Sequence, residues 1–309
     1  MKAKGQPNIV TDAQGVKKVN SLVIDNANSA VARQTMSCEV INEDALTISV
    51  QDIGNYTMMW TPTEAIELPM GYFAELGLEA KHPCPEIIAF TLGFLLTENL
   101  IQSLSEVRAV SICPDVQSLV NVTLFAPKAS QVIRKDVVMT SSCGICGGRE
   151  LISNEYKALP VSGNQLTIKA ELFAAMMTNL KAQQAVFKQC GGAHAAAVFD
   201  DQGKLLVVTE DLGRHNALDK AIGKCLLSNI ELKGKGVLLS SRLSLEMVSK
   251  AARAGIELIA AVSAPSSLAI EVAERCNITL LGFVRDQRLT CFSHYKRLDM
   301  GDNGKLSCQ

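Results

Sequence analysis

Residues 236–284, GVLLSSRLSLEMVSKAARAGIELIAAVSAPSSLAIEVAERCNITLLGFV, decide the fold class of this 309-residue chain. Apolar runs of strand length alternate here with segments of helical periodicity. The pattern predicts strands over 236–239, 256–262 and 278–284, and helices over 245–254 and 267–275. Gly255 follows the first helix at the position where a left-handed glycine often ends one. Alternating strands and helices predict an α/β domain, with a largely parallel sheet covered by helices.

The same domain extends upstream and slightly downstream of this stretch. Apolar residues at helical spacing predict a helix over 169–188, which Gly191 and Gly192 end. A hairpin is predicted from 195–199 and 204–209, joined by the turn 200–203. Asn216 is a predicted cap for a helix over 216–225, and 289–293 adds a last strand. We therefore place the α/β domain at 150–297 and a tail at 298–309.

The first half of the chain has a different pattern. Residues 46–50 and 56–60 predict a hairpin, 87–100 a helix, and 107–138 further strands. This indicates a smaller N-terminal α+β subdomain over 39–139. Residues 1–38 are polar and irregular, so a tail is expected there.

Composition narrows the function classes. The chain has 30 basic and 31 acidic residues and is 48% hydrophobic, so net charge gives no general attraction to nucleic acid or to an anionic membrane. We find no signal-peptide pattern at the start and no apolar run that spans a bilayer. A cytoplasmic protein is expected, with neither a nucleic-acid nor a membrane partner. Most of the ten cysteines lie singly in apolar patterns, as buried thiols do in a reducing compartment.

Cys143 and Cys146 are the exception among the cysteines. They stand in the stretch TSSCGICGG at 140–148, and the flanking glycines and serines predict a mobile loop over 140–149. A Cys-x-x-Cys pair lowers the pKa of one thiol, and the thiolate is the nucleophile. A reactive sulfur on a moving loop is suited to collecting a group at one place and delivering it at another.

Arginines and hydroxyl groups follow the predicted strands, where ligands of open α/β sheets bind. Arginine forks and helix N-termini favour phosphate, and Asp211 and Asp286 are acceptors suited to a base. These positions predict a site for a phosphorylated, nucleotide-like ligand. The residues that carry it are Arg214, His215, Ser240, Arg242, Ser263, Arg285, Asp286, Gln287 and Arg288.

Four motifs together resemble the FdhD family, the sulfurtransferase accessory proteins of formate dehydrogenase. They are SSCGICG at 141–147, GGAHAAA at 191–197, EDLGRHNALDK at 210–220 and VSAPSSLA at 262–269. The third motif is long and highly specific, whereas the cysteine pair alone is not. The similarity extends from about residue 39 to residue 294.

The resemblance implies a cytidine deaminase-like fold in the second half of the chain. It also implies that sulfur passes from a cysteine desulfurase to a molybdenum or tungsten bis(guanine dinucleotide) cofactor, for which a guanine nucleotide can substitute. Cys143 matches the persulfide position, with Cys146 as its partner. The stretch from Phe283 and Val284 to Arg288 matches the cofactor-binding region, and the family pattern also places His194 at the cleft. A homodimer and formate dehydrogenase as partner are implied as well.

The chain departs from the family pattern at two places. Residues 65–86 look like an insertion that carries His82 and Cys84, and Ser241 stands where the family usually has glycine. A serine there demands a suitable backbone angle and takes space near a bound phosphate.

Other functions fit some of the same residues. A thioredoxin-like oxidoreductase would use the cysteine pair, and a structural zinc site would need Cys190 and His194 as two further ligands. A zinc deaminase needs His-x-Glu and Pro-Cys-x-x-Cys, but His194 is followed by alanines and no Pro-Cys-x-x-Cys occurs. A cofactor-binding chaperone would need the arginines but not the loop thiols.

Overall fold

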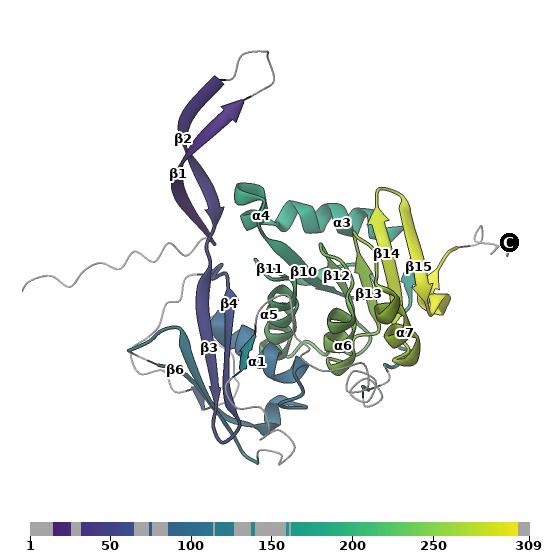
Figure 1. Cartoon of the computed structure of the whole chain (residues 1–309). Helices are drawn as coiled ribbons and strands as arrows, with labels where there is room; N and C mark the ends of the chain where they lie inside the picture. Colours follow the sequence, from purple (N-terminus) through teal and green to yellow (C-terminus); the bar gives the residue numbers. More distant parts are fainter. Residues whose placement is uncertain are drawn as a thin grey trace, which may run out of the picture.

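We analysed a computed structural model of the chain (Figure 1). The structure describes residues 15–25, 32–64, 74–75, 86–113, 115–126, 137–139, 159–160 and 162–301. The predicted cysteine loop at 140–149, with Cys143 and Cys146, lies outside these ranges, as does most of the predicted insertion at 65–86.

The second half of the chain forms a mixed six-stranded sheet within the described residues, here called the C-terminal sheet. Its order is β11-β10-β12-β13-β14-β15. The strands are β10 (His194–Phe199), β11 (Leu205–Asp211), β12 (Gly236–Leu239), β13 (Leu258–Ala261), β14 (Thr279–Arg285) and β15 (Arg288–Ser293). The α/β class is confirmed, while the likeness to cytidine deaminase stays a prediction.

The expectation of a largely parallel sheet was wrong. Of the five described strand pairs, only β12–β13 and β13–β14 are parallel, while the other three are antiparallel. Tight turns join β10 to β11 and β14 to β15, and a tight turn can only join antiparallel strands. Crossover connections, which parallel pairing requires, join neighbouring strands of this sheet only from β12 through β14.

Helices cover both faces of the C-terminal sheet, as Figure 1 shows, with α3 (Leu172–Gln183) on one side. The opposite side carries α5 (Arg214–Leu227), α6 (Leu245–Arg253) and α7 (Ser267–Arg275). The helix expected over 169–188 is two helices, α3 and α4 (Ala185–Cys190), because Gln184 has a ψ of 83° and interrupts the helical backbone.

The first half forms a second sheet, here called the N-terminal sheet, in the order β5-β6-β7-β3-β4-β8. Its described strands are β3 (Asp44–Val50), β4 (Gly54–Trp60), β5 (Ala74–Glu75), β6 (Val107–Ile112), β7 (Leu119–Leu124) and β8 (Val137–Met139). The predicted hairpin is confirmed by the antiparallel pairing of β3 with β4. A short 3₁₀ helix, Leu104–Glu106, precedes β6.

Helix α1 (Glu86–Thr97) joins the two halves. All twelve of its residues are buried, and a helix that is apolar all round is typical of a core position. One hydrophobic core includes β3, β4 and α1 from the first half, and α5 and one face of the C-terminal sheet from the second. The two predicted units therefore fold around a shared core.

Helices α1 and α5 approach each other at two glycines. A Cβ atom placed on Gly93 would lie 1.8 Å from the Asp219 carbonyl oxygen, and one placed on Gly223 would lie 1.7 Å from that of Ala89. The main chains are therefore in direct contact here, and no other residue type fits either position.

Both predicted tails contain ordered strands, so those boundaries were wrong. Strands β1 (Val16–Asp25) and β2 (Ala32–Ile41) form a hairpin that projects from the body (Figure 1). Its base packs through Val16 against α4. Both faces of its outer part are open to solvent, so its sequence lacks the alternation that reveals a half-buried strand. At the other end, β16 (Leu298–Asp299) pairs with β9 (Ile168–Lys169), and a 3₁₀ helix, Tyr295–Arg297, precedes it.

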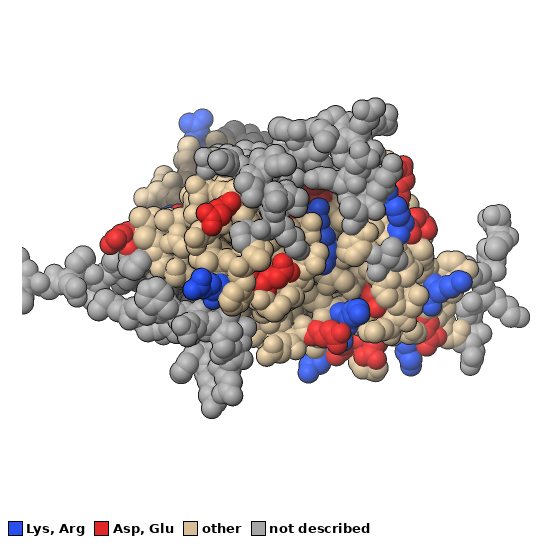
Figure 2. Space-filling model, turned by 90° about the horizontal axis from the view of Figure 1, so that it is seen from below, with Lys and Arg blue, Asp and Glu red and all other residues tan. Residues whose placement is uncertain are grey.

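The charges on the surface and the hydropathy of the helices can be compared with the composition of the chain. On the face shown in Figure 2, Lys and Arg side chains are interspersed with Asp and Glu side chains. Within the described residues, no helix has both the length and the apolar character needed to cross a membrane.

Candidate functional site

The strand ends predicted to bind a ligand meet at one edge of the C-terminal sheet. Strand β10 is antiparallel to both β11 and β12, so β11 runs in the same direction as β12, β13 and β14. The carboxyl ends of these four strands therefore lie beside the start of β10. His194 is paired with Asp211 across this edge. The sheet thus brings together residues that are far apart in the sequence.

Arg214, His215 and Arg242 act electrostatically on His194. The pKa of His194 is lowered, first by burial and then by the charges of Arg214, His215 and Arg242. Arg214 and His215 form the first turn of α5, whose N-terminal amides add partial positive charge. We call the cluster of His194, Arg214, His215, Ser240 and Arg242 the sheet-edge site. Its charge suits an anionic ligand, and the binding of such a ligand stays a prediction.

Ser240 ties β10 to the end of β12. Its hydroxyl accepts a hydrogen bond from the Ala195 amide at 2.8 Å, and its amide donates to the Ala195 carbonyl at 3.0 Å. The next residue, Ser241, is buried and its hydroxyl donates to the Arg242 carbonyl. Ser241 is not among the described residues with positive φ, so this position does not need the conformational freedom of glycine.

The turn between β14 and β15 forms a separate group at the same edge. Arg285, Asp286, Gln287 and Arg288 are all exposed. Strands β12 and β14 are two spacings apart, about 10 Å, so this turn lies beside the sheet-edge site rather than within it. Ser263 connects the two regions, because its carbonyl accepts a hydrogen bond from the Phe283 amide at 3.2 Å.

Phe283 and Val284 differ sharply in their exposure. Phe283 is 37% exposed, has a φ of 53° and lies 5.9 Å from the Arg285 guanidinium. An aromatic residue with positive φ is a backbone outlier, which is more common at functional sites. Val284 is buried in the core on the α3 side of the sheet. Its side chain, one of the predicted binding groups, therefore serves packing.

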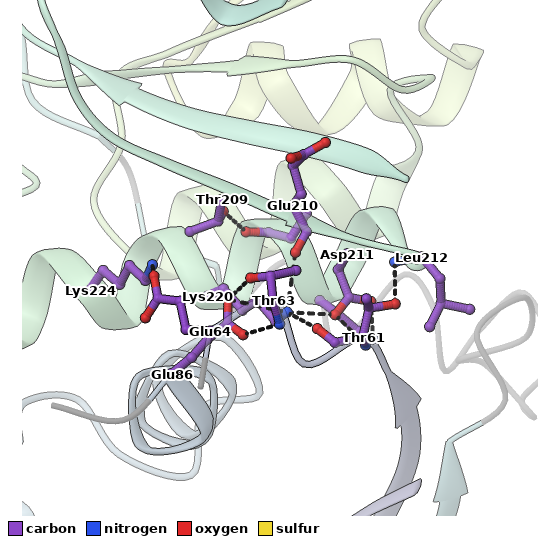
Figure 3. A network of polar contacts seen from close by, with 12 residues as sticks. Thr61, Thr63, Glu64, Glu86, Thr209, Glu210, Asp211, Leu212, Lys220 and Lys224 are labelled. Carbon is purple, nitrogen blue, oxygen red and sulfur yellow. Dashed lines mark hydrogen bonds and ion pairs between the residues drawn. The ribbon is translucent and has the colours of Figure 1, made fainter. Parts of the chain in front are cut away.

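The specific motif at 210–220 is used mainly to build the fold, as Figure 3 shows for Asp211 and Lys220. The Asp211 carboxylate is fully buried and accepts hydrogen bonds from the Thr61 and Gly213 amides and the Asn216 amide group, each at 2.9 Å. It is also 2.9 Å from the Lys220 ammonium. Asp211 therefore has no free acceptor for a base, contrary to expectation. Asn216 is likewise not the helix cap, which is Gly213.

Lys220 joins both halves of the molecule from inside. Its ammonium donates to the carbonyls of Thr61 and Glu210, lies 3.4 Å from the Glu86 carboxylate, and sits 4.9 Å from the Trp60 ring. Glu210 accepts the amides of Val186 and Phe187 at the start of α4. Of this motif, Arg214 and His215 are the residues that these internal contacts leave as candidates for ligand binding.

Single cysteines in the described part of the chain behave as packing residues. Burial raises the pKa of Cys225 to about 12 and also raises that of Cys276, so neither thiol is an effective nucleophile. Cys190 donates its thiol hydrogen to the Val186 carbonyl at 3.2 Å. No group of three or more potential metal ligands occurs among the residues that the structure describes.

Comparison with known proteins identifies the family. The model of the FdhD/NarQ family matches residues 84–299, more than two thirds of the chain. The chain belongs to the FdhD/NarQ family. The matched range contains α1, the C-terminal sheet, the sheet-edge site and the cysteine pair, whereas the hairpin β1–β2 precedes it.

Curated FdhD relatives cover most of the chain. A "Sulfur carrier protein FdhD" from Saccharolobus solfataricus is 37% identical over 209 residues, which is 67% of this chain and 78% of that protein. One from Xanthomonas euvesicatoria pv. vesicatoria is 37% identical over 77% of this chain and 86% of its own. One from Bordetella petrii is 32% identical over 87% and 89%.

A solved structure shares the fold. It is a crystal structure from Desulfotalea psychrophila, described as a formate dehydrogenase accessory protein, with a TM-score of 0.67 and 23% identity. The superposition covers 92% of this chain and 99% of the other. The arrangement of two sheets around a shared core is therefore not peculiar to this FdhD/NarQ member.

Sequence reasoning missed one residue next to the site. Glu246, in the first turn of α6, lies 3.2 Å from His215 through Oε2 and Nε2. The sequence offers no signal for this contact, because α5 and α6 are brought together only by their packing on the sheet.

Proposed function

We propose that this protein is a sulfur carrier for formate dehydrogenase maturation. It accepts a persulfide sulfur from a cysteine desulfurase on Cys143 and transfers it to a molybdenum or tungsten bis(guanine dinucleotide) cofactor, which is the substrate and not a resident group. The names of the FdhD relatives support the carrier role. The observation that supports binding of the cofactor is the electrostatic effect of Arg214, His215 and Arg242 on His194.

The chemistry of loading follows from the thiolate. The Cys143 thiolate attacks the outer sulfur of the desulfurase persulfide, the sulfur–sulfur bond breaks, and the desulfurase cysteine leaves as a thiolate. Cys143 then carries the sulfur as its own persulfide. Cys146 has two possible roles: it lowers the pKa of Cys143, or it attacks the inner sulfur and releases hydrosulfide as the two cysteines form a disulfide.

The sheet-edge site supplies the place of delivery. Its guanidinium groups and the N-terminus of α5 bind phosphate oxygens of the cofactor, and the Phe283–Arg288 turn beside it extends the contact surface. The protein works as a homodimer in the cytoplasm in this proposal, with the desulfurase and formate dehydrogenase as successive partners. A chaperone without sulfur transfer would bind the same ligand but would not load Cys143.

Binding of GDP, a mimic of half of the cofactor's nucleotide portion, tests the site. We expect Arg242→Gln to weaken GDP binding about tenfold or more, since a hydrogen bond to a charged group contributes roughly 1.5–3 kcal/mol. Isothermal titration calorimetry measures this directly. Arg275→Gln, at the exposed far end of α7, is the matched control and should bind as the wild type does. Equal affinity in the two variants would remove Arg242 from the site.

The lowered pKa of His194 predicts how affinity depends on pH. A bound anion stabilises imidazolium and raises the pKa of His194, so binding takes up a proton at pH values above the free-state pKa. GDP affinity should therefore increase as the pH falls from about 8 toward that pKa and then level off.

His194→Gln isolates this effect, because GDP has a phosphate that itself titrates near about pH 6. The variant should lose the part of the dependence that belongs to His194, measured by the same calorimetric series. An unchanged pH profile in His194→Gln would show that His194 does not sense the ligand.

A further inference from the structure

A carboxylate stands next to the cationic sheet-edge site. Glu246 begins α6 and is paired with His215 at the start of α5, with Nε2 and Oε2 3.2 Å apart. The side chains are 32% and 17% exposed, respectively. Ser244 donates its hydroxyl to the same carboxylate oxygen at 3.1 Å. The carboxylate is therefore held from two sides, and it in turn holds the imidazole.

The contact between Glu246 and His215 shows which group donates the hydrogen bond. The pKa of Glu246 is lowered, chiefly by the hydrogen bond to His215, with smaller contributions from the charge of His215, from Ser244 and from Arg214, while burial opposes them. An ionised carboxylate can only accept hydrogen bonds. Nε2 of His215 must therefore carry the proton, and Nδ1 is the second nitrogen, which accepts when the ring is neutral and donates when it is charged.

The charged groups near His215 and His194 lie on α5 itself and on three other segments of the fold. Arg214 is adjacent on α5, His194 lies on β10, Arg242 follows β12, and the buried Asp211 ends β11. The cationic groups stabilise the ionised Glu246, but its negative charge repels an anionic ligand bound at the same cluster. Glu246 is thus better explained by what it does for His215 than by direct attraction of the ligand.

We propose that Glu246 is a positioning residue that fixes His215 as the tautomer protonated on Nε2 and leaves Nδ1 as the nitrogen that meets the ligand. The assignment deepens the proposed function and rests on it for the identity of the ligand, an anionic guanine nucleotide. In many sites, a carboxylate that does not touch the ligand orients a histidine that does. The hydrogen bond from the histidine to the carboxylate fixes the tautomer and the orientation of the ring.

The tautomer itself gives the first test. Long-range ¹H–¹⁵N NMR spectra of the full chain with ¹⁵N-labelled histidine report which ring nitrogen is protonated; at about pH 8.5 a free imidazole is neutral. We expect the neutral His215 ring to be protonated on Nε2 alone in the wild type and to be a mixture in Glu246→Ala. Protonation on Nδ1 in the wild type, retention of both protons, or an unchanged spectrum in the variant would overturn the assignment.

The control is a second histidine–carboxylate pair. Glu274 lies in the last turn of α7, and its Oε2 atom is 3.4 Å from Nε2 of His294. Glu274→Gln should leave the His215 signals and the GDP affinity unchanged. Glu246→Gln keeps a hydrogen-bonding group of the same size, so it should restore part of the Nε2-protonated form relative to Glu246→Ala.

The affinity for GDP gives a second test. A positioning role and a purely electrostatic role of Glu246 predict opposite changes in this affinity when the side chain is removed. Loss of the negative charge alone would tighten GDP binding, whereas loss of positioning should weaken it in Glu246→Ala by about fivefold, which is about 1 kcal/mol. In a His215→Ala background the same substitution should no longer weaken binding, because the positioned group is gone. Tighter binding in the single variant, or equal weakening in both backgrounds, would contradict positioning.

The two proposals can fail separately. If the wild type shows the Nε2 tautomer but does not bind GDP, the ligand assignment of the proposed function is wrong while the orientation of His215 by Glu246 holds. If GDP binds but Glu246→Ala changes neither tautomer nor affinity, the positioning role is wrong while the anion site holds.

Discussion

A chain with Cys143→Ala is expected to leave formate dehydrogenase inactive when it is the only carrier available to the cell. Activity should fall by about two orders of magnitude or more, because removal of a nucleophile commonly costs at least that much. The assay is formate oxidation in extracts of a carrier-deficient strain that expresses the variant. Transfer of ³⁵S from a desulfurase to purified protein measures the loading step directly.

The controls separate chemistry from folding. Cys38→Ala changes another free, partly buried thiol, in the hairpin β1–β2, and should support wild-type activity. The Cys143→Ala protein should unfold at the wild-type temperature and still bind GDP. Full enzyme activity with Cys143→Ala would refute the carrier role, whereas normal ³⁵S loading would show that another cysteine accepts the sulfur.

Cys146→Ala distinguishes the two roles left open for the second cysteine. If Cys146 releases the sulfur, its loss should let ³⁵S accumulate on Cys143 without delivery. If it lowers the pKa of Cys143, loading itself should slow and its pH profile should move upward, because less thiolate is present at neutral pH.

Gly223→Ala is expected to have the largest effect on stability. Its new methyl group would lie 1.7 Å from the Ala89 carbonyl oxygen, so α1 and α5 must separate. Both helices belong to the shared core, and overpacking there costs about 1–3 kcal/mol or more, so we expect a loss of at least about 3 kcal/mol. Gly93→Ala should act similarly, and urea unfolding followed by circular dichroism measures both.

Gly191→Ala and Gly255→Ala provide the contrast. Both glycines have positive φ, but no described atom lies within 4 Å of the added Cβ. They test backbone strain alone, for which about 1–2 kcal/mol is expected. If Gly223→Ala were no worse than these two variants, the close contact of α1 with α5 would not limit stability.

Local sequence signals predicted the elements but not always their direction. The strands β3, β4, β12, β13 and β14 follow directly from hydrophobic periodicity and turn residues. Periodicity does not report strand direction, so β10 was not recognised as antiparallel to β12. The hairpin β1–β2 was missed for a related reason, since a two-stranded arm with solvent on both sides needs no strict alternation.

The candidate site follows from the sequence in outline because the topology of the sheet brings strand ends together, and ligand binding there stays a prediction. Arg214, His215, Ser240 and Arg242 follow successive strands and do gather around His194. The sequence could not show that the carboxylate oxygens of Asp211 are occupied by contacts with Thr61, Asn216 and Lys220. Thr61 is 150 residues away along the chain. Nor could the sequence show that Val284 points into the core.

The sequence by itself determined the α/β class and the family and located the Cys143–Cys146 pair, because these depend on local periodicity and on contiguous motifs. The tertiary structure alone decided which motif residues serve the fold and which stay available to the proposed ligand. That division depends on contacts between distant segments: α1 against α5, Asp211 and Lys220 against Thr61, and Glu246 against His215. The role of a side chain depends on the neighbours that bury it and form hydrogen bonds with it. When those neighbours are distant in the sequence, only packing brings them together.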